Sequence, residues 1–230
     1  MNGILKHNEK AKVVVFSLEL NKKAFLQRLF ASEYDMEQWK IKKAFIAEDK
    51  SIFTNEREKY ILNAKDYIKK YGNRFMIADD INGIEAIEDL LESLRKNFDF
   101  IPDYILIDYA NIMTTKKLAD ENKHIQFSIW MKFLAKKRNI HVQAICQANR
   151  ATKDNDDGYA RTENLADSDQ YGRDAFVVYS IKTSKDTNDY FVNPTKNRNG
   201  KAESEITLVW NGMSGKIYGT DKPKLSNNKF

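Results

Sequence analysis

Cysteine is almost absent from this sequence, and long apolar runs are missing altogether. The single cysteine, Cys146, excludes an intramolecular disulfide and a zinc site made of cysteines alone, and it favours a reducing compartment. No stretch approaches the ~20 consecutive apolar residues that a transmembrane helix needs. The first seven residues lack the pattern of a secretory signal. These absences predict a cytoplasmic protein without a membrane partner.

The rest of the composition is that of a folded, mildly basic protein. The 230 residues are 42% hydrophobic and 31% charged, and 38 Lys and Arg against 33 Asp and Glu give a net charge of +5. This charge is compatible with a nucleic-acid partner. The length favours one domain with a substantial core, which we expect over residues 1–220, followed by a flexible polar tail at 221–230.

Hydrophobic patterning predicts an α/β fold. Apolar runs that are typical of buried strands occur at 13–18, 74–78, 103–109 and 140–146. Helical spacing of apolar residues follows Asn21 and recurs at 36–47, 56–71, 84–94 and 124–138. This alternation predicts a doubly wound, mainly parallel sheet that is covered by helices.

The last third of the chain has a different pattern. A polar segment at 148–173 is long enough to be a functional or a disordered loop. Strand-like runs then occur at 176–182, 190–192, 204–210 and 216–218, separated by turn-forming residues. We expect these runs to form antiparallel strands that extend the sheet.

Three of the expected parallel strands end in polar side chains: Glu19, Asp108 and Gln147. Such strand ends meet at one edge of a sheet, where open α/β folds bind ligands. In phosphoanhydride hydrolysis, the glutamate would orient and deprotonate water, the aspartate would hold Mg²⁺ directly or through water, and the glutamine would sense the terminal phosphate. Each residue alone is more simply a polar strand end, but the ordered set favours the catalytic interpretation.

A second polar group is the run Lys196-Asn197-Arg198-Asn199-Gly200. Alternate residues of an extended segment point the same way, so Lys196 and Arg198 would present two cations side by side. Such a pair could stabilise charge on a transferring phosphoryl group. A basic hairpin turn on a basic surface is the alternative.

Five segments occur in a characteristic order along the sequence: Phe16-Ser17-Leu18-Glu19-Leu20, Leu106-Ile107-Asp108-Tyr109, Cys146-Gln147-Ala148-Asn149-Arg150, Asn164-Leu165-Ala166-Asp167-Ser168 and Lys196-Asn197-Arg198-Asn199-Gly200. In order and spacing they resemble the DnaB-type replicative helicases. The resemblance extends to about Tyr218. It implies a RecA-like three-layer sandwich, the cofactors ATP and Mg²⁺, and a homohexameric ring on single-stranded DNA. A primase and a helicase loader are the further partners it implies.

The resemblance also implies a role for each matching residue. Glu19 resembles the catalytic glutamate, Asp108 the Walker B aspartate and Gln147 the γ-phosphate sensor. Lys196 and Arg198 resemble finger residues that reach the nucleotide of the neighbouring subunit.

The DNA-tracking loop of the family corresponds to a segment that departs from the family pattern. The family commonly has an arginine, an acidic residue and a glycine there, where this sequence has Ala166, Asp167 and Asp169. Backbone amides would still bind phosphates, and Arg161 or Arg173 would replace the missing charge. The DNA-contacting set implied is Arg161, Ala166, Asp167, Ser168, Asp169 and Arg173.

The phosphate-binding loop of the family, G-x-x-x-x-G-K-S/T, does not occur in this sequence. The pairs Gly200-Lys201 and Gly215-Lys216 lie near the C-terminus, and neither precedes Ser or Thr. In the family the loop lies one helix before the strand at 13–18. We therefore expect a C-terminal helicase fragment that lacks the first strand, is inactive alone and is marginally stable or prone to aggregation.

Other functions remain compatible with these residues. A RecA-like recombinase or a clock-type ATPase would share the fold, although Lys-x-Arg-x-Gly favours the helicase ring. A non-catalytic remnant that binds DNA or joins a ring is a second alternative. A metal-dependent nuclease is disfavoured because Glu19 and Asp108 lack a third clustered ligand. The Lys-, Asn- and Ile-rich composition suits an AT-rich phage genome, which would place the protein in the host cytoplasm.

Overall fold

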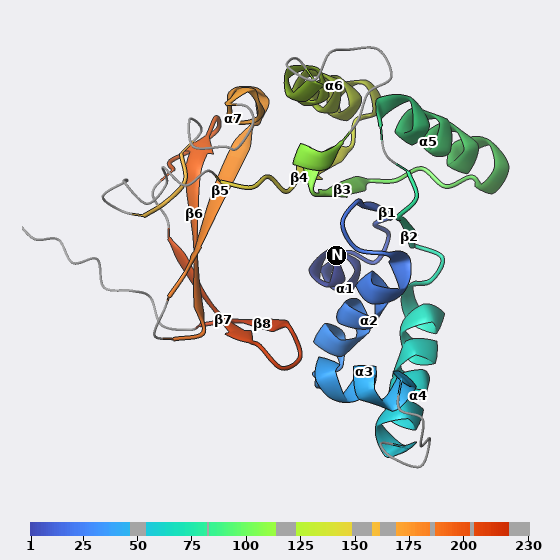
Figure 1. The fold of residues 1–230 in the computed structure, drawn as a ribbon. Helices are drawn as coiled ribbons and strands as arrows, with labels where there is room; N and C mark the ends of the chain where they lie inside the picture. The colour runs from blue at the N-terminus through green and yellow to red at the C-terminus, as the bar shows by residue number, and fades with distance from the viewer. Residues whose placement is uncertain are drawn as a thin grey trace, which may run out of the picture.

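The computed structural model describes residues 1–46, 54–81, 83–113, 123–148, 158–161, 169–184, 187–202 and 205–220. Figure 1 shows its elements in chain order. The first half contains α1 (Asn2–His7), β1 (Val13–Ser17), α2 (Lys22–Glu33), α3 (Gln38–Ile46), α4 (Thr54–Tyr71), β2 (Phe75–Ala78), α5 (Ile84–Phe98), β3 (Tyr104–Asp108) and the 3-10 helix η1 (Ala110–Ile112). The second half contains α6 (Lys123–Arg138), β4 (His141–Ala144), α7 (Gln170–Asp174), β5 (Val177–Thr183), β6 (Asp189–Asn197), β7 (Ile206–Asn211) and β8 (Lys216–Gly219).

The parallel sheet has the strand order β2-β1-β3-β4. β1 lies between β2 and β3, and all of its residues are buried. Its run of valines followed by phenylalanine suits a strand that is covered on both faces. Ser17 of β1 pairs with Asp108 of β3, so these two strands end at the same level. The predicted parallel sheet is confirmed.

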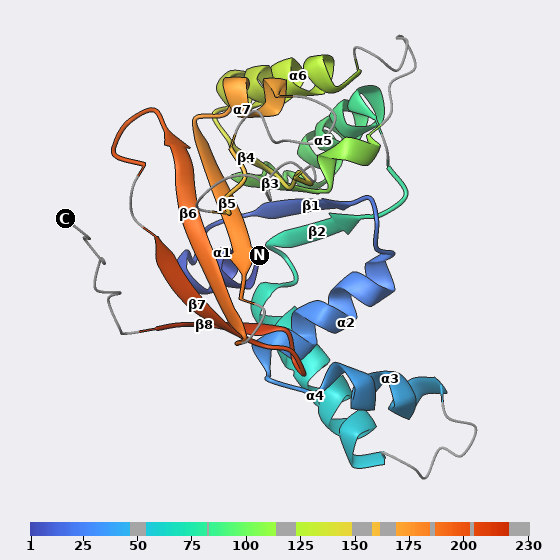
Figure 2. The same ribbon diagram turned by 60° about the vertical axis from the view of Figure 1, so that its left-hand side comes forward.

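Helices cover both faces of this sheet, as the three-layer prediction requires (Figure 2). Val14 and Phe16 of β1 pack against α5 and α6 on one face. Val13 and Val15 pack against α1, α2 and α4 on the other face. Burial of each such side chain contributes roughly 1.5–3 kcal/mol to folding. The alternation of side chains along β1 therefore supplies both halves of the core.

The antiparallel strands form a second sheet with the order β5-β6-β7-β8. The predicted antiparallel strands are thus confirmed, but their predicted role as an extension of the parallel sheet is wrong. Among the described residues, β4 pairs only with β3, and β5 pairs only with β6. No described strand lies between β4 and β5 to join the two sheets (Figure 1).

Two groups of side-chain contacts attach the antiparallel sheet to the helical layers. At one end, Asp174 of α7 accepts a hydrogen bond of 2.9 Å from Ser128 Oγ of α6. At the other end, Asp35 after α2 accepts hydrogen bonds from Ser214 Oγ at 2.6 Å and from Tyr218 Oη at 2.8 Å. These contacts fix the sheet at both ends while the edges of β4 and β5 stay apart.

The polar segment predicted as a loop at 148–173 contains the short helix α7 at its C-terminal end. Arg173 is therefore a helical residue, and the prediction was wrong there. Residues 149–157 and 162–168 lie outside the described residues, as does the tail 221–230, whose flexibility stays a prediction. None of the described helices combines the length and apolar character needed to cross a bilayer.

Candidate functional site

The carboxyl ends of β1, β3 and β4 carry Glu19, Asp108 and Gln147 at the same edge of the parallel sheet. β3 pairs in parallel with β1 on one side and with β4 on the other. Asp108 is the last residue of β3, and Glu19 and Gln147 follow shortly after the ends of β1 and β4. The structure therefore brings the three predicted residues to one edge. Their chemical roles stay predictions.

Asp108 is partly buried at this edge. Burial of its carboxyl group and the negative charge of Glu19 raise its pKa above the ordinary value of 3.8, and Arg28 partly offsets this rise. The Leu18 amide donates a hydrogen bond of 2.7 Å to the Asp108 carbonyl oxygen, which ties the ends of β1 and β3 together. Two neighbouring carboxylates with this mutual repulsion would both be stabilised by a cation.

The donor atoms at this edge fit Mg²⁺, which prefers carboxylate oxygens and retains several waters. Within the described residues there is no cluster of three or more His, Cys, Asp or Glu side chains that would enclose a metal ion. Asp108 would therefore supply a protein oxygen, and water and phosphate oxygens would complete the coordination.

Asn111 positions the strand end that carries Gln147. The Gln147 amide donates to Asn111 Oδ1 at 3.1 Å, and the Asn111 residue is buried with 9% exposure. Backbone hydrogen bonds from Ala110 to Ile145 and from Ile145 to Ile107 continue this junction. The Asp108–Tyr109 peptide between β3 and η1 is cis. Sequence reasoning missed this function of Asn111, although an amide three residues after a strand-end aspartate was a usable signal.

Asp79 also lies at the carboxyl edge, after β2, but its carboxylate stabilises a helix. Its Oδ2 accepts a hydrogen bond from the Lys22 amide in the first turn of α2. Asn21 Oδ1 accepts from the Ala24 amide at 2.9 Å. These two acceptors satisfy amides that have no partner within the helix. Asp79 is therefore part of the α2 cap.

The predicted finger residues Lys196 and Arg198 contact α7 and are not brought to the carboxyl edge. Lys196 Nζ donates to the carbonyl oxygens of Gly172 at 2.7 Å and Arg173 at 2.8 Å. Arg198 Nη2 donates to the same Arg173 oxygen at 2.8 Å. Burial and the charge of Arg198 lower the pKa of Lys196. The expectation that the two cations lie side by side is met by this shared acceptor.

The described DNA-contacting candidates lie on or near the antiparallel sheet. Arg173 and Asp169 form an ion pair of 2.6 Å along α7. Arg161 is exposed and follows Ala160, whose amide donates to Ser180 Oγ of β5 at 2.8 Å. The candidates Ala166, Asp167 and Ser168 lie outside the described residues.

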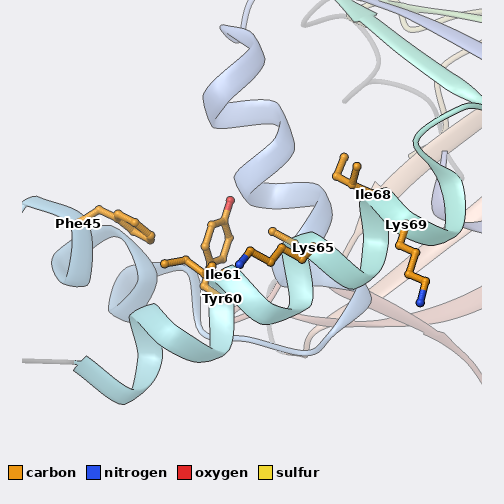
Figure 3. Close-up of a pocket in the computed structure, with 7 residues that line it drawn as sticks. Phe45, Tyr60, Ile61, Lys65, Ile68 and Lys69 are labelled. Carbon is orange, nitrogen blue, oxygen red and sulfur yellow. The ribbon is translucent and has the colours of Figure 1, made fainter.

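An open apolar pocket of about 560 Å³ lies on α3 and α4 (Figure 3). Its lining residues are Phe45, Tyr60, Ile61, Ala64, Lys65, Ile68 and Lys69. None of these side chains comes from the strand ends that carry the predicted catalytic residues. The pocket is therefore separate from the candidate site.

Comparison with known sequences places nearly the whole chain in one family. The model of the DnaB-like helicase C terminal domain matches residues 1–218. A probable plasmid replicative DNA helicase of Chlamydia psittaci is 28% identical over 223 residues, which cover 91% of this chain and 45% of the relative. The replicative DNA helicase DnaB of Mycobacterium leprae is 26% identical over 168 residues, covering 72% of this chain and 26% of the relative. The chain thus spans less than half the length of these relatives.

Comparison with solved structures identifies the fold. A solved ATPase domain superimposes with a TM-score of 0.76 at 19% identity, covering 93% of this chain and 76% of that structure. A DnaB-like replicative helicase, solved in a study of its interactions with primase, gives a TM-score of 0.75 at 19% identity and covers 93% of this chain and 52% of the other. The fold is RecA-like. Because the family model matches almost every residue, this chain belongs to the family of DnaB-like helicase C-terminal domains.

Proposed function

We propose that this chain is the motor region of a replicative helicase, in which ATP hydrolysis drives movement along single-stranded DNA and separation of the duplex. The observation that supports this proposal is the position of Glu19, Asp108 and Gln147 at the ends of neighbouring parallel strands. A carboxylate base, a metal-holding carboxylate and an amide donor are the groups that phosphoanhydride hydrolysis requires.

Each of the three residues has a separate task in this proposal. Glu19, which is exposed, orients the attacking water and accepts its proton. Asp108 would hold Mg²⁺, directly or through water, and the ion would supply positive charge that neutralises the phosphates. The side-chain amide of Gln147 donates a hydrogen bond to the terminal phosphate. The junction made by Asn111 keeps the Gln147 backbone next to the end of β3.

The ring and the DNA contacts belong to the same proposal. In a homohexamer, Lys196 and Arg198 would complete the nucleotide site of the neighbouring subunit. Residues 166–169, with Arg161 and Arg173, would follow the DNA backbone without reading bases. A primase and a helicase loader would be the further partners.

The sequence contains no G-x-x-x-x-G-K-S/T loop to hold the phosphates. We therefore propose that hydrolysis needs this loop from residues other than these 230, and that the 230-residue chain binds ATP weakly when alone. Among the described strands, β4 pairs only with β3, and β5 pairs only with β6. The other edge of each strand offers backbone amide and carbonyl groups with which a further strand could pair, and this supports the proposal.

The proposal is tested by joining a phosphate-loop segment to the N-terminus of the chain and measuring DNA-stimulated ATP hydrolysis. Glu19→Gln should lower kcat by roughly 10²–10⁴-fold with little change in nucleotide affinity, because it removes the base and keeps the shape. Glu9→Gln, an exposed carboxylate before β1, is the matched control and should leave kcat unchanged. Normal hydrolysis by the Glu19→Gln protein would contradict the assignment.

The absent phosphate loop favours one other function, that of a non-catalytic subunit that binds DNA or joins a ring. Reading the DNA upstream of Met1 separates the two possibilities. An in-frame phosphate loop supports the motor. If that loop is absent from the coding sequence and the purified chain still binds single-stranded DNA without hydrolysing ATP, the non-catalytic function is correct.

A further inference from the structure

The C-terminal end of α7 is held by two cations from the end of β6. Lys196 Nζ donates to the carbonyl oxygens of Gly172 and Arg173, at 2.7 and 2.8 Å. Arg198 Nη2 donates to the Arg173 carbonyl at 2.8 Å. The Arg198 guanidinium also lies over the Phe176 ring at 5.2 Å. Both side chains are therefore committed to one helix end.

Lys196 and Arg198 stabilise the C-terminal end of α7 by binding its last carbonyl groups. The last carbonyl groups of a helix have no partner within it and carry its partial negative charge, so lysine and arginine side chains stabilise them. The amide of Arg198 also donates to the Phe176 carbonyl at 3.0 Å, which anchors the hairpin beside the start of β5. α7 and the hairpin therefore hold each other in place.

The carbonyl groups of α7 occupy two of the three N–H donors of Lys196 and one of the five of Arg198. Phosphate oxygens carry negative charge, so they attract ammonium and guanidinium groups more strongly than neutral carbonyl oxygens do, and they can accept two parallel hydrogen bonds from an arginine. An anion that reaches the pair would therefore compete with Gly172 and Arg173 for both side chains. Asp174, the next residue, would stay bound to Ser128 and Lys132 of α6. Loss of the cations would consequently loosen the helix end without detaching it from α6.

We propose that Lys196 and Arg198 form a switch in which phosphate binding withdraws them from Gly172 and Arg173 and loosens the C-terminal turn of α7. This inference rests on the proposed function, which supplies the phosphate as part of the ATP bound by a neighbouring subunit. Asp169 and Arg173, both in the predicted DNA-contacting set, pair with each other along this helix. The switch therefore connects nucleotide binding with the conformation of DNA-contacting residues.

Hydrogen–deuterium exchange of the 230-residue chain tests the switch, with inorganic tripolyphosphate as the probe. The reporting amides are those of Arg173 and Ala175, which donate to the carbonyl groups of Asp169 and Tyr171 at 3.0 and 3.1 Å. Tripolyphosphate should accelerate their exchange by roughly tenfold, as expected when hydrogen bonds to charged groups are lost. Sodium chloride at equal ionic strength controls for screening.

Variants of the hairpin make the result specific. Lys196→Met combined with Arg198→Ala should accelerate exchange at the same amides without tripolyphosphate and abolish the response to it. Lys201→Met removes an exposed lysine of the same hairpin and should behave as the unchanged chain. Amides of β1 should exchange equally in all proteins, which separates loosening of α7 from loss of the fold.

Two results would overturn the switch. Unchanged exchange of α7 in the double variant would mean that the cations do not hold the helix. Unchanged exchange in the original chain at saturating tripolyphosphate, or absence of tripolyphosphate binding by calorimetry, would mean that phosphate does not displace them. Neither readout depends on hydrolysis. A joined protein that fails to hydrolyse ATP while α7 still responds would therefore refute the proposed motor and leave the switch standing.

Discussion

The backbone amide of Gln147 donates a hydrogen bond to the side-chain oxygen of Asn111, and this contact joins the ends of β3 and β4. We expect Asn111→Leu to lower the free energy of unfolding by about 1–3 kcal/mol, because it leaves a partly buried amide without its acceptor. Urea denaturation measures this as a shifted midpoint with an unchanged slope. Asn97→Leu on the exposed surface of α5 is the control and should cost less than about 0.5 kcal/mol. Equal effects of the two substitutions would contradict the role of Asn111.

Asp108 should reduce the stability of the metal-free chain at neutral pH. Burial and Glu19 raise its pKa in the folded chain above 3.8, so ionisation costs stability as the pH rises through the folded pKa. Asp108→Asn should therefore raise the melting temperature at pH 7, and the gain should disappear in acid below the ordinary pKa, where both states carry the proton. Thermal unfolding across this pH range checks the sign. A lower melting temperature for Asp108→Asn at pH 7 would show that the carboxylate is stabilising.

Asp35 should have the opposite pH dependence. Hydrogen bonds from Ser214 and Tyr218 lower its pKa below 3.8, so its contribution to stability is present above that value and is lost as the pH falls through the folded pKa. Asp35→Asn should lower the melting temperature at pH 7. On acidification, the melting temperature of this variant should fall less than that of the unchanged chain. Asp89→Asn, at an exposed position on α5, is the control. A pH profile for Asp35→Asn identical to that of the unchanged chain would refute the role of this contact.

The exposed apolar side chains of β5 should promote aggregation of the isolated chain. Val177, Tyr179 and Ile181 are exposed on a strand that has one described neighbour. We expect Ile181→Lys to reduce light scattering during heating, because a charge on an edge strand opposes pairing with another chain. Ile101→Lys removes a similarly exposed isoleucine before β3 and should have a smaller effect. If both substitutions reduced light scattering equally, the aggregation would arise from general surface hydrophobicity and not from the edge of β5.

The sequence was sufficient to predict the parallel sheet and its polar edge, for identifiable reasons. The run Val13–Phe16 is apolar on both faces of a strand, which is typical of a sheet that is covered on both sides. The parallel direction then placed Glu19, Asp108 and Gln147 at one edge. The alternation of Lys196 and Arg198 likewise predicted neighbouring cations, although it could not identify the α7 carbonyl groups as their partners.

Other features could not be predicted because they depend on tertiary contacts. α7 is too short and polar to show a helical period, and its C-terminal end is stabilised by residues of another element. β6 continues past its predicted end at Val192 and includes Pro194. A strand tolerates proline there because the register of β6 against β5 shifts at this point, and because the described pairing of β6 with β7 ends at Val192. The separation of the two sheets likewise depends on which strands pair with one another, and the hydrophobic pattern within one strand does not specify this.

The hydrogen bond from Ser214 to Asp35 joins positions that are 179 residues apart. Contacts of such long range carry a high entropic cost of loop closure and slow folding. During synthesis, the end of α2 cannot be fastened until the β7–β8 hairpin has left the ribosome. We therefore expect the parallel sheet and its helices to form before the β7–β8 hairpin attaches to the end of α2.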